Sequence, residues 1–141
     1  MPDIHVDIKI PNQTKYLSLI GRIGEDIAKE LDRYTGDRET LAYHMNLVLT
    51  EAMTNAIKHA NAGDPDKTVK INISITDMDL IIKVEDSGQG FDINQIPCPD
   101  FERLDDRGRG IFLIKSLMDS VCYSRLRSGS GNVLIMSKHL D

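Results

Sequence analysis

Hydrophobic and polar residues alternate one by one in two parts of the chain. Over residues 4–10 every second residue is isoleucine or valine, and Pro11 ends the pattern. The same alternation recurs over residues 68–76, and a shorter apolar run covers residues 80–85. A period of two is typical of a strand with one buried face. The short linker at residues 77–79 predicts that the second and third of these strands form a hairpin.

Two stretches near the start of the chain instead have apolar residues at intervals of three and four, which is the period of an amphipathic helix. The first covers about residues 13–34, with glycines at positions 21 and 24 that favour close approach of another backbone. A turn at residues 35–37 separates it from the second, which runs from near Arg38 to about Ala60. The breakers in residues 61–65 end this second helix.

The last third of the chain begins with an aperiodic stretch. Residues 92–107 contain two prolines and show little periodicity, which predicts a mobile loop. The loop is longer than an ordinary connection, which is typical of a functional or a disordered segment. A third helix is expected from Gly110 to about Ser120, followed by strands at residues 121–127 and 132–139. Together these elements predict one α+β domain, residues 1–141, with three helices on one face of a mixed, mostly antiparallel sheet.

Composition narrows the class of protein. The chain has 141 residues, of which 40% are hydrophobic and 28% charged, as in an ordinary globular domain. It has no apolar run of membrane-spanning length and no signal-peptide pattern at its start, so we expect a cytoplasmic protein without membrane contact. The net charge of −5 and the lack of a basic cluster argue against direct nucleic-acid binding. Cys98 and Cys122 lie in no metal-binding pattern and are expected to be free thiols.

The second predicted helix carries the first candidate chemistry. Glu51 and Asn55 are four residues apart and therefore share a face, although their neighbours are mostly apolar or small. The pair is either an exposed polar stripe or a site with partners, because burying both groups unpaired costs several kcal/mol. A hydrated magnesium ion and a water held for proton transfer are suitable partners.

Two glycine motifs follow, and each has two readings. Asp86-Ser-Gly88-Gln-Gly90 comes after an apolar strand; it is either a plain turn or a place where the backbone passes close to a flat ring whose amine the aspartate accepts. Gly108-Arg109-Gly110 precedes a predicted helix. It is either a flexible helix entry or an anion site, since helix N-termini offer unpaired N–H groups and a favourable dipole.

The order of these three motifs resembles the ATP-binding fold shared by DNA gyrase, heat-shock chaperones, histidine kinases and mismatch-repair ATPases. Two segments are most similar to the anti-sigma-factor serine kinases: residues 51–59, which read Glu-Ala-x-Thr-Asn-Ala-x-x-His, and residues 109–119, which read Arg-Gly-x-Phe-Leu-Ile-Lys-Ser-Leu-Met-Asp. The resemblance covers nearly the whole chain. It implies a Bergerat-type sandwich that binds ATP and Mg²⁺.

The resemblance also implies residue roles. Asn55 matches the magnesium ligand, Glu51 the proposed general base and Asp86 the aspartate that holds the adenine amino group. Lys58 shares the face of the pair, either near a phosphate or as a solvated lysine. Asn132 stands where many relatives have a threonine that supports adenine through water, and its amide can both donate and accept.

The resemblance to the anti-sigma-factor serine kinases also implies that residues 92–109 form the lid over the nucleotide phosphates. Either Arg107 or Arg109 can reach those phosphates, and the sequence does not choose between them. Gly108 and Gly110 would form the phosphate-binding turn. Arg22 matches in position an arginine that relatives use to engage protein partners, although a solvated charge is the alternative.

The expected function is an ATP-dependent protein serine kinase that also acts as an anti-sigma factor. Its substrate would be a serine on an anti-anti-sigma partner, its other partner would be a sigma factor, and it would form a homodimer. These expectations about partners and assembly come only from the resemblance. Three alternatives stay open: a switch kinase without sigma binding, the detached ATP-binding domain of a histidine kinase, and a nucleotide-binding interaction module without turnover. The absence of a helical hairpin with a phosphoacceptor histidine argues against the second, and the presence of Glu51 and Asn55 against the third.

Overall fold

The computed structural model describes residues 3–32, 34–60, 64–87, 106–126 and 131–140. Its strands are β1 (Ile4–Pro11), β2 (Thr68–Thr76), β3 (Asp79–Asp86), β4 (Ser120–Arg125) and β5 (Asn132–His139). Its helices are α1 (Leu17–Lys29), α2 (Arg38–Asn55) and α3 (Asp106–Leu117), with a 3₁₀ turn η1 (Thr14–Tyr16) before α1 and a π-helical turn η2 (Ala56–Ala60) after α2.

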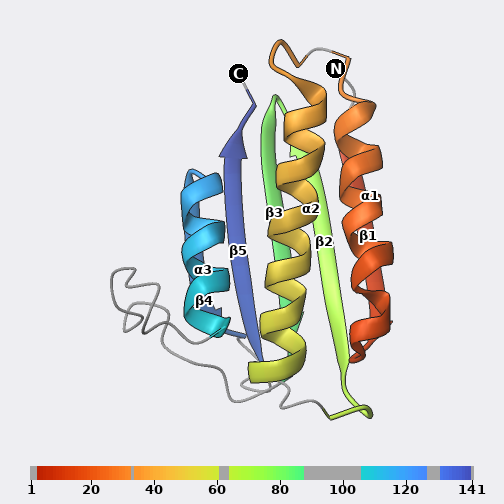
Figure 1. Cartoon of the computed structure of the whole chain (residues 1–141), viewed down its shortest axis with the longest axis vertical. Helices are drawn as coiled ribbons and strands as arrows, with labels where there is room; N and C mark the ends of the chain where they lie inside the picture. The colour runs from red at the N-terminus through yellow and green to blue at the C-terminus, as the bar shows by residue number, and fades with distance from the viewer. Residues whose placement is uncertain (1–2, 33, 61–63, 88–105, 127–130, 141) are drawn as a thin grey trace.

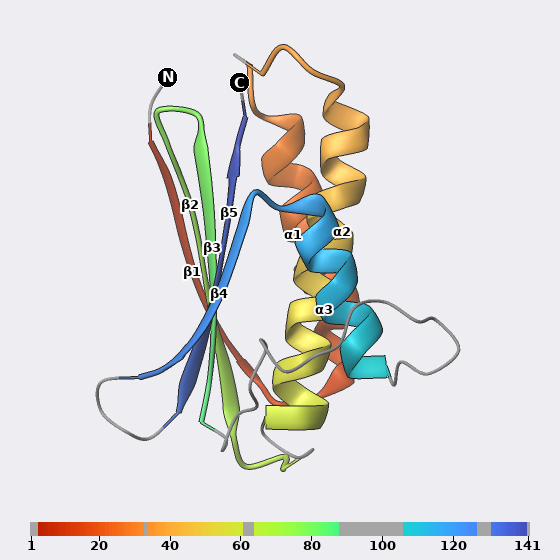
Figure 2. The same ribbon diagram turned by 90° about the vertical axis from the view of Figure 1, so that its left-hand side faces the viewer.

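The three helices cover one face of a single five-stranded sheet, so the predicted α+β sandwich is confirmed (Figures 1 and 2). The strand order is β1-β2-β3-β5-β4, and every described pair is antiparallel. The expectation of a mixed sheet was therefore wrong in this detail. β3 and β4 do run in the same direction, linked through α3, but β5 lies between them and pairs with both.

The alternating residues of the strands and the inner stripes of the helices form one core. The inward-facing isoleucines of β2, at positions 71, 73 and 75, are each at most 1% exposed. The glycines of α1 allow it to approach α2 closely, as predicted: a Cβ on Gly24 would lie 2.5 Å from Leu49 Cδ1, and one on Gly21 would lie 2.6 Å from Asn46 Nδ2. This packing fixes α2, the helix that carries Glu51 and Asn55.

Several element ends differ from the prediction. α1 ends at Lys29, earlier than the expected residue 34, and β3 begins at Asp79, so the β2–β3 turn has two residues rather than three. Those two, Asp77 and Met78, have φ values of 49° and 67°. Positive φ at both central residues gives a two-residue turn a twist that matches the twist of the two strands it joins. Periodicity could not show this, because it locates strands but not the backbone angles between them.

Asp37 caps the N-terminus of α2. Its carboxylate accepts hydrogen bonds from the backbone N–H groups of Glu39 (2.9 Å) and Thr40 (3.4 Å) and from the Thr40 hydroxyl (2.8 Å). The hydroxyl bond and then the two backbone bonds lower the pKa of Asp37 below its ordinary value of 3.8. The cap fixes where α2 begins, and with it the register of the helix along its length. No helix in the described part of the chain is long and apolar enough to cross a membrane.

Candidate functional site

Four segments that are distant in sequence meet at one end of the molecule. These are the last turns of α2, the end of β3, the start of β5 and the start of α3, all at the lower end in Figure 1. Antiparallel pairing explains part of this arrangement, because it places the last residue of β3 beside the first residue of β5. The described residues of the three predicted motifs therefore come together in space.

Glu51 and Asn55 face the beginning of α3. A Cβ built on Gly110 would lie 2.7 Å from Glu51 Oε2 and 3.3 Å from Asn55 Nδ2, so only glycine leaves both side chains undisturbed. Asn55 is 5% exposed, whereas Glu51 is half-buried. The pair is therefore part of a packed contact between α2 and α3 and not an exposed polar stripe.

The amide of Asn55 is suited to a hard cation. Its Nδ2 donates to the backbone carbonyl of Glu51 at 3.1 Å, one helical turn earlier. This bond uses the donor side of the amide, and the oxygen side, Oδ1, accepts no hydrogen bond from the residues that the structure describes. An amide oxygen is a ligand that Mg²⁺ takes readily, together with waters and substrate phosphates. The residues present thus fit a magnesium ion held through Asn55.

Asp86 lies at the buried end of β3 and is 6% exposed. Its Oδ1 accepts a hydrogen bond of 3.0 Å from Asn132 Nδ2, and Asn132 is 3% exposed. Behind the pair the two backbones are in close contact, since a Cβ on Gly131 would lie 2.0 Å from the carbonyl oxygen of Asp86. Asn132, which stands where many relatives of the resembled family have a threonine, therefore contacts Asp86 directly through its amide.

A small cavity joins the Asp86 pair to α2. Its lining includes Asn55, Asp86 and Tyr123 together with four apolar or small residues, which are Ala52, Ala56, Val84 and Leu134. Its volume is about 10 Å³, room for about one water, so it marks an apolar wall beside the Asp86 carboxylate and does not itself hold a ring. Sequence reasoning missed Tyr123, although the alternation of residues 121, 123 and 125 in the last strands could have placed it on the inner face.

The other predicted residues are less well placed. Lys58 is exposed in the π turn, which changes the angular spacing that was expected to bring it beside Asn55. Arg107, Gly108 and Arg109 belong to the first turn of α3, but the structure does not describe their side chains. Gly88, Gly90 and residues 92–105 of the expected lid lie outside the described residues.

The start of α3 corrects the predicted helix boundary. The helix begins at Asp106, so Gly108 and Gly110 lie inside it and do not precede it, and residues 106–109 of the expected lid are helical. Glycine lowers helix propensity, which is why the pattern placed the boundary too late. The unpaired N–H groups of this helix therefore belong to residues 106–109, one turn earlier than expected.

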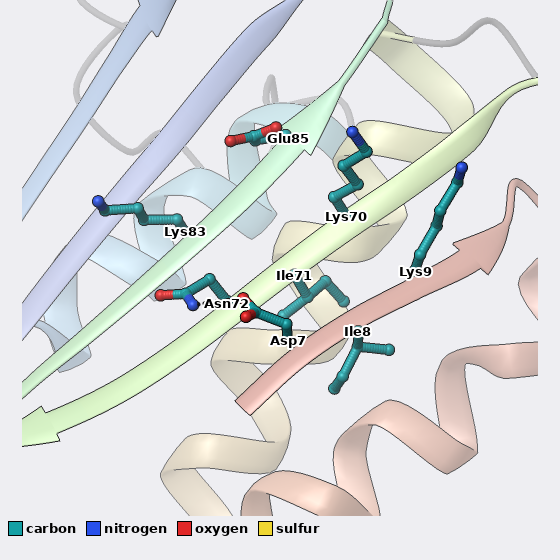
Figure 3. Close-up of a pocket in the computed structure, with 8 residues that line it drawn as sticks. All are labelled: Asp7, Ile8, Lys9, Lys70, Ile71, Asn72, Lys83 and Glu85. Atoms are coloured by element: carbon teal, nitrogen blue, oxygen red, sulfur yellow. Dashed lines mark hydrogen bonds between the residues drawn. The ribbon is translucent and has the colours of Figure 1, made fainter. Parts of the chain in front are cut away.

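A larger hollow lies elsewhere, on the sheet face that the helices leave open. Its volume is about 280 Å³, and its floor is the backbone of β1, β2 and β3 (Figure 3). Three lysines and two acids surround it, together with Ile8, Ile71 and Asn72; the charged residues are Lys9, Lys70, Lys83, Asp7 and Glu85. These charges nearly cancel, and none of the predicted motifs reaches this face. The candidate functional site is therefore the end of the fold where Glu51 and Asn55 lie near the buried Asp86.

Comparisons with known proteins concern the family and the fold of the chain. Residues 11–138 match the family model of the histidine kinase-like ATPase domain. The chain is 28% identical over 145 residues to the serine-protein kinase RsbW of Bacillus subtilis, with 97% of this chain and 86% of that protein covered. It is 29% identical to the RsbW of Listeria monocytogenes serotype 4b, with 96% and 87% covered.

A solved structure shows the same fold. The blue-light activated histidine kinase of Erythrobacter litoralis EL346 superposes with a TM-score of 0.53 at 23% identity, and the match covers 93% of this chain and 42% of that one. At this identity the likeness concerns the fold alone. The family match spans nearly every element described above, from the end of β1 to β5. The chain belongs to the histidine kinase-like ATPase domain family.

Proposed function

We propose that this protein is an ATP-dependent protein serine kinase that also acts as an anti-sigma factor. One observation carries the proposal: Glu51, Asn55 and Gly110 are in contact at the same end of the fold as the buried Asp86–Asn132 pair. The similarity to RsbW serine-protein kinases along nearly the whole chain supports it.

The nucleotide would bind with its base beside Asp86. The carboxylate accepts hydrogen bonds only, so it suits the exocyclic amine of adenine and disfavours a carbonyl at the same position. Gly110, at the end of the first turn of α3, lies next to Glu51 and Asn55, and the backbone N–H groups of residues 106–109 and the helix dipole would favour the phosphates. Residues 92–109 would cover those phosphates as a lid, with Arg107 or Arg109 as the cation that reaches them.

Asn55 would hold magnesium through its amide oxygen. When bound, the ion would supply positive charge beside the phosphate oxygens. The hydrogen bond from Asn55 Nδ2 to the carbonyl of Glu51 keeps the amide in the orientation that this role needs.

Glu51 would act as general base for phosphoryl transfer. A serine hydroxyl of the partner protein gives its proton to the Glu51 carboxylate as its oxygen bonds to the γ-phosphorus of ATP. The bond between that phosphorus and the bridging oxygen breaks, and ADP leaves. A positioned base of this kind contributes about 10²–10⁴-fold to a rate.

The outer surface of α1 would bind the protein partners. Arg22 is exposed there, and Leu19, one turn earlier on the same face, is 46% exposed. An exposed leucine beside an arginine is a suitable start for an interface, which commonly has an apolar centre and enriched arginine. The partners would be a sigma factor and an anti-anti-sigma factor, and the kinase would be a cytoplasmic homodimer.

Two substitutions separate catalysis from binding. Glu51→Gln should leave ATP affinity within a few fold and slow phosphotransfer by about 10²–10⁴-fold. Asn55→Ala should lose both magnesium-dependent ATP binding and transfer. The measurements are calorimetric titration with and without magnesium, and mass spectrometry of a partner protein captured from native extract. Ser116→Ala, on the exposed face of α3, is the control.

The alternative of a non-catalytic binding module makes a different prediction. If wild-type protein binds ATP and the captured partner but never transfers phosphate, the kinase assignment is wrong and the nucleotide site stands. Transfer at the wild-type rate by Glu51→Gln would instead remove Glu51 as the base.

A further inference from the structure

Asp86, Asn132 and Arg125 form a row of side chains across three strands. Asp86 on β3 is directly opposite Asn132 on β5, and Asn132 is directly opposite Arg125 on β4. Side chains that are directly opposite on neighbouring strands lie on the same face and interact. The row lies on the face of the sheet that carries Val84 and Leu134, which line the small cavity beside Asp86.

The hydrogen bonds along the row have a defined direction. Asn132 Nδ2 donates to Asp86 Oδ1 at 3.0 Å, and Arg125 Nη1 donates to Asn132 Oδ1 at 3.5 Å. A carboxylate only accepts and a guanidinium only donates. The amide of Asn132 therefore has a single orientation that satisfies both neighbours, with its nitrogen toward Asp86 and its oxygen toward Arg125.

The backbone leaves little room for this arrangement to shift. Gly131 is in close contact with the carbonyl of Asp86, and the Leu126 N–H donates to the Gly131 carbonyl at 2.8 Å. Asn132 is 3% exposed, so bulk water cannot replace a partner that its amide loses. Losing either hydrogen bond would therefore leave a buried polar group unpaired, which is unfavourable.

We propose that Arg125 is a positioning residue for base selection, which acts by locking the amide of Asn132. This inference rests on the proposed ATP site. A 6-oxo purine would place a carbonyl oxygen near the Asp86 carboxylate, where two acceptors repel each other. Asn132 is close enough to Asp86 for its NH₂ group to turn and donate to such a carbonyl. Arg125 opposes this turn, because it holds the oxygen side of the same amide.

The lock gives Arg125 a role that its charge alone would not have. A cation near the site would strengthen binding of every nucleoside triphosphate equally. The lock instead strengthens the preference for a 6-amino over a 6-oxo purine. The ratio of the two affinities therefore separates the two roles.

The test compares ATP with inosine triphosphate, which carries a carbonyl in place of the 6-amino group. Arg125→Met removes the guanidinium and keeps an aliphatic stem for packing. Calorimetry on the purified chain should show that this variant lowers the ATP-to-ITP affinity ratio by about threefold to tenfold, the scale of one hydrogen bond. Arg125→Lys retains a donor and should keep more of the ratio. Ser124→Ala, on the opposite face of β4, is the matched control and should leave the ratio unchanged.

A double variant makes the test specific to Asn132. If its freed amide accepts the 6-oxo base, then adding Asn132→Ala to Arg125→Met should restore the preference for ATP, because the competing donor is gone. Equal weakening of both nucleotides by Arg125→Met, or a lowered ratio that Asn132→Ala does not restore, would overturn the lock. Wild-type protein that binds neither nucleotide would overturn the ATP site itself, whereas an ATP preference insensitive to Arg125→Met refutes only this inference.

Discussion

Gly110→Ala is expected to reduce catalysis while the protein stays folded. The new Cβ would lie 2.7 Å from Glu51 Oε2 and 3.3 Å from Asn55 Nδ2, whereas ordinary contacts begin at 3.4 Å. The Glu51 carboxylate must therefore move by several tenths of an ångström. Gly110 is in a helix, so alanine gains about 0.5–1 kcal/mol in helix stability. Displacing Glu51 from its preferred rotamer costs a similar amount, about 0.5–1.5 kcal/mol.

The gain in helix stability and the rotamer cost nearly cancel in the free energy of unfolding. The rate still falls, because Glu51 is displaced. We expect the melting temperature to change by no more than about 4 °C, the shift that about 1 kcal/mol produces in a domain of this size. A misplacement approaching 1 Å at a reacting centre costs about 10²-fold in rate, so phosphotransfer should fall by about that factor. Differential scanning calorimetry and single-turnover transfer to the captured partner measure the two quantities.

Gly24→Ala is the matched control for this prediction. Its Cβ would lie 2.5 Å from Leu49 Cδ1 in the α1–α2 interface, and Leu49, two residues before Glu51, lies on the opposite side of α2. Overpacking of this kind costs about 1–3 kcal/mol, so stability should fall while transfer per folded molecule is kept. A Gly110→Ala variant that transfers phosphate within threefold of wild type would refute the placement of Glu51 as the base.

Three further predictions concern the base site, the partner surface and the start of α2. Asp86→Asn should weaken ATP binding by about 1.5–3 kcal/mol, the scale for a hydrogen bond to a charged group; unchanged affinity in calorimetry would remove the adenine assignment. Arg22→Ala should reduce capture of protein partners in a pull-down and leave ATP affinity unchanged, and equal capture would exclude this face of α1. Asp37→Ala should lower the melting temperature at neutral pH, because the cap of α2 is lost. Since folding lowers the pKa of Asp37, its contribution is complete above pH 3.8 and disappears as pH falls through the lowered value, so melting curves of the two proteins should converge in acid.

The sequence by itself determined the secondary structure elements and the order of the motifs. The alternation in β1 and β2 and the three-to-four spacing in α1 and α2 are local consequences of burying one face of each element, and they can be read without knowing the partner. Residue types also indicated the chemistry of Glu51, Asn55 and Asp86, because carboxylates and amides in apolar surroundings need partners. The resemblance added the family, which the comparison with known proteins confirmed.

Only the tertiary structure decided which residues meet. The insertion of β5 between β3 and β4 brings Asn132 between Asp86 and Arg125, and no local pattern encodes that strand order. The start of α3 was also decided by packing: Gly110 lies within the helix because its missing side chain lets α3 approach Glu51 and Asn55. Propensity penalises glycine wherever it occurs in a helix, whereas the contact that offsets this penalty exists only after the chain has folded.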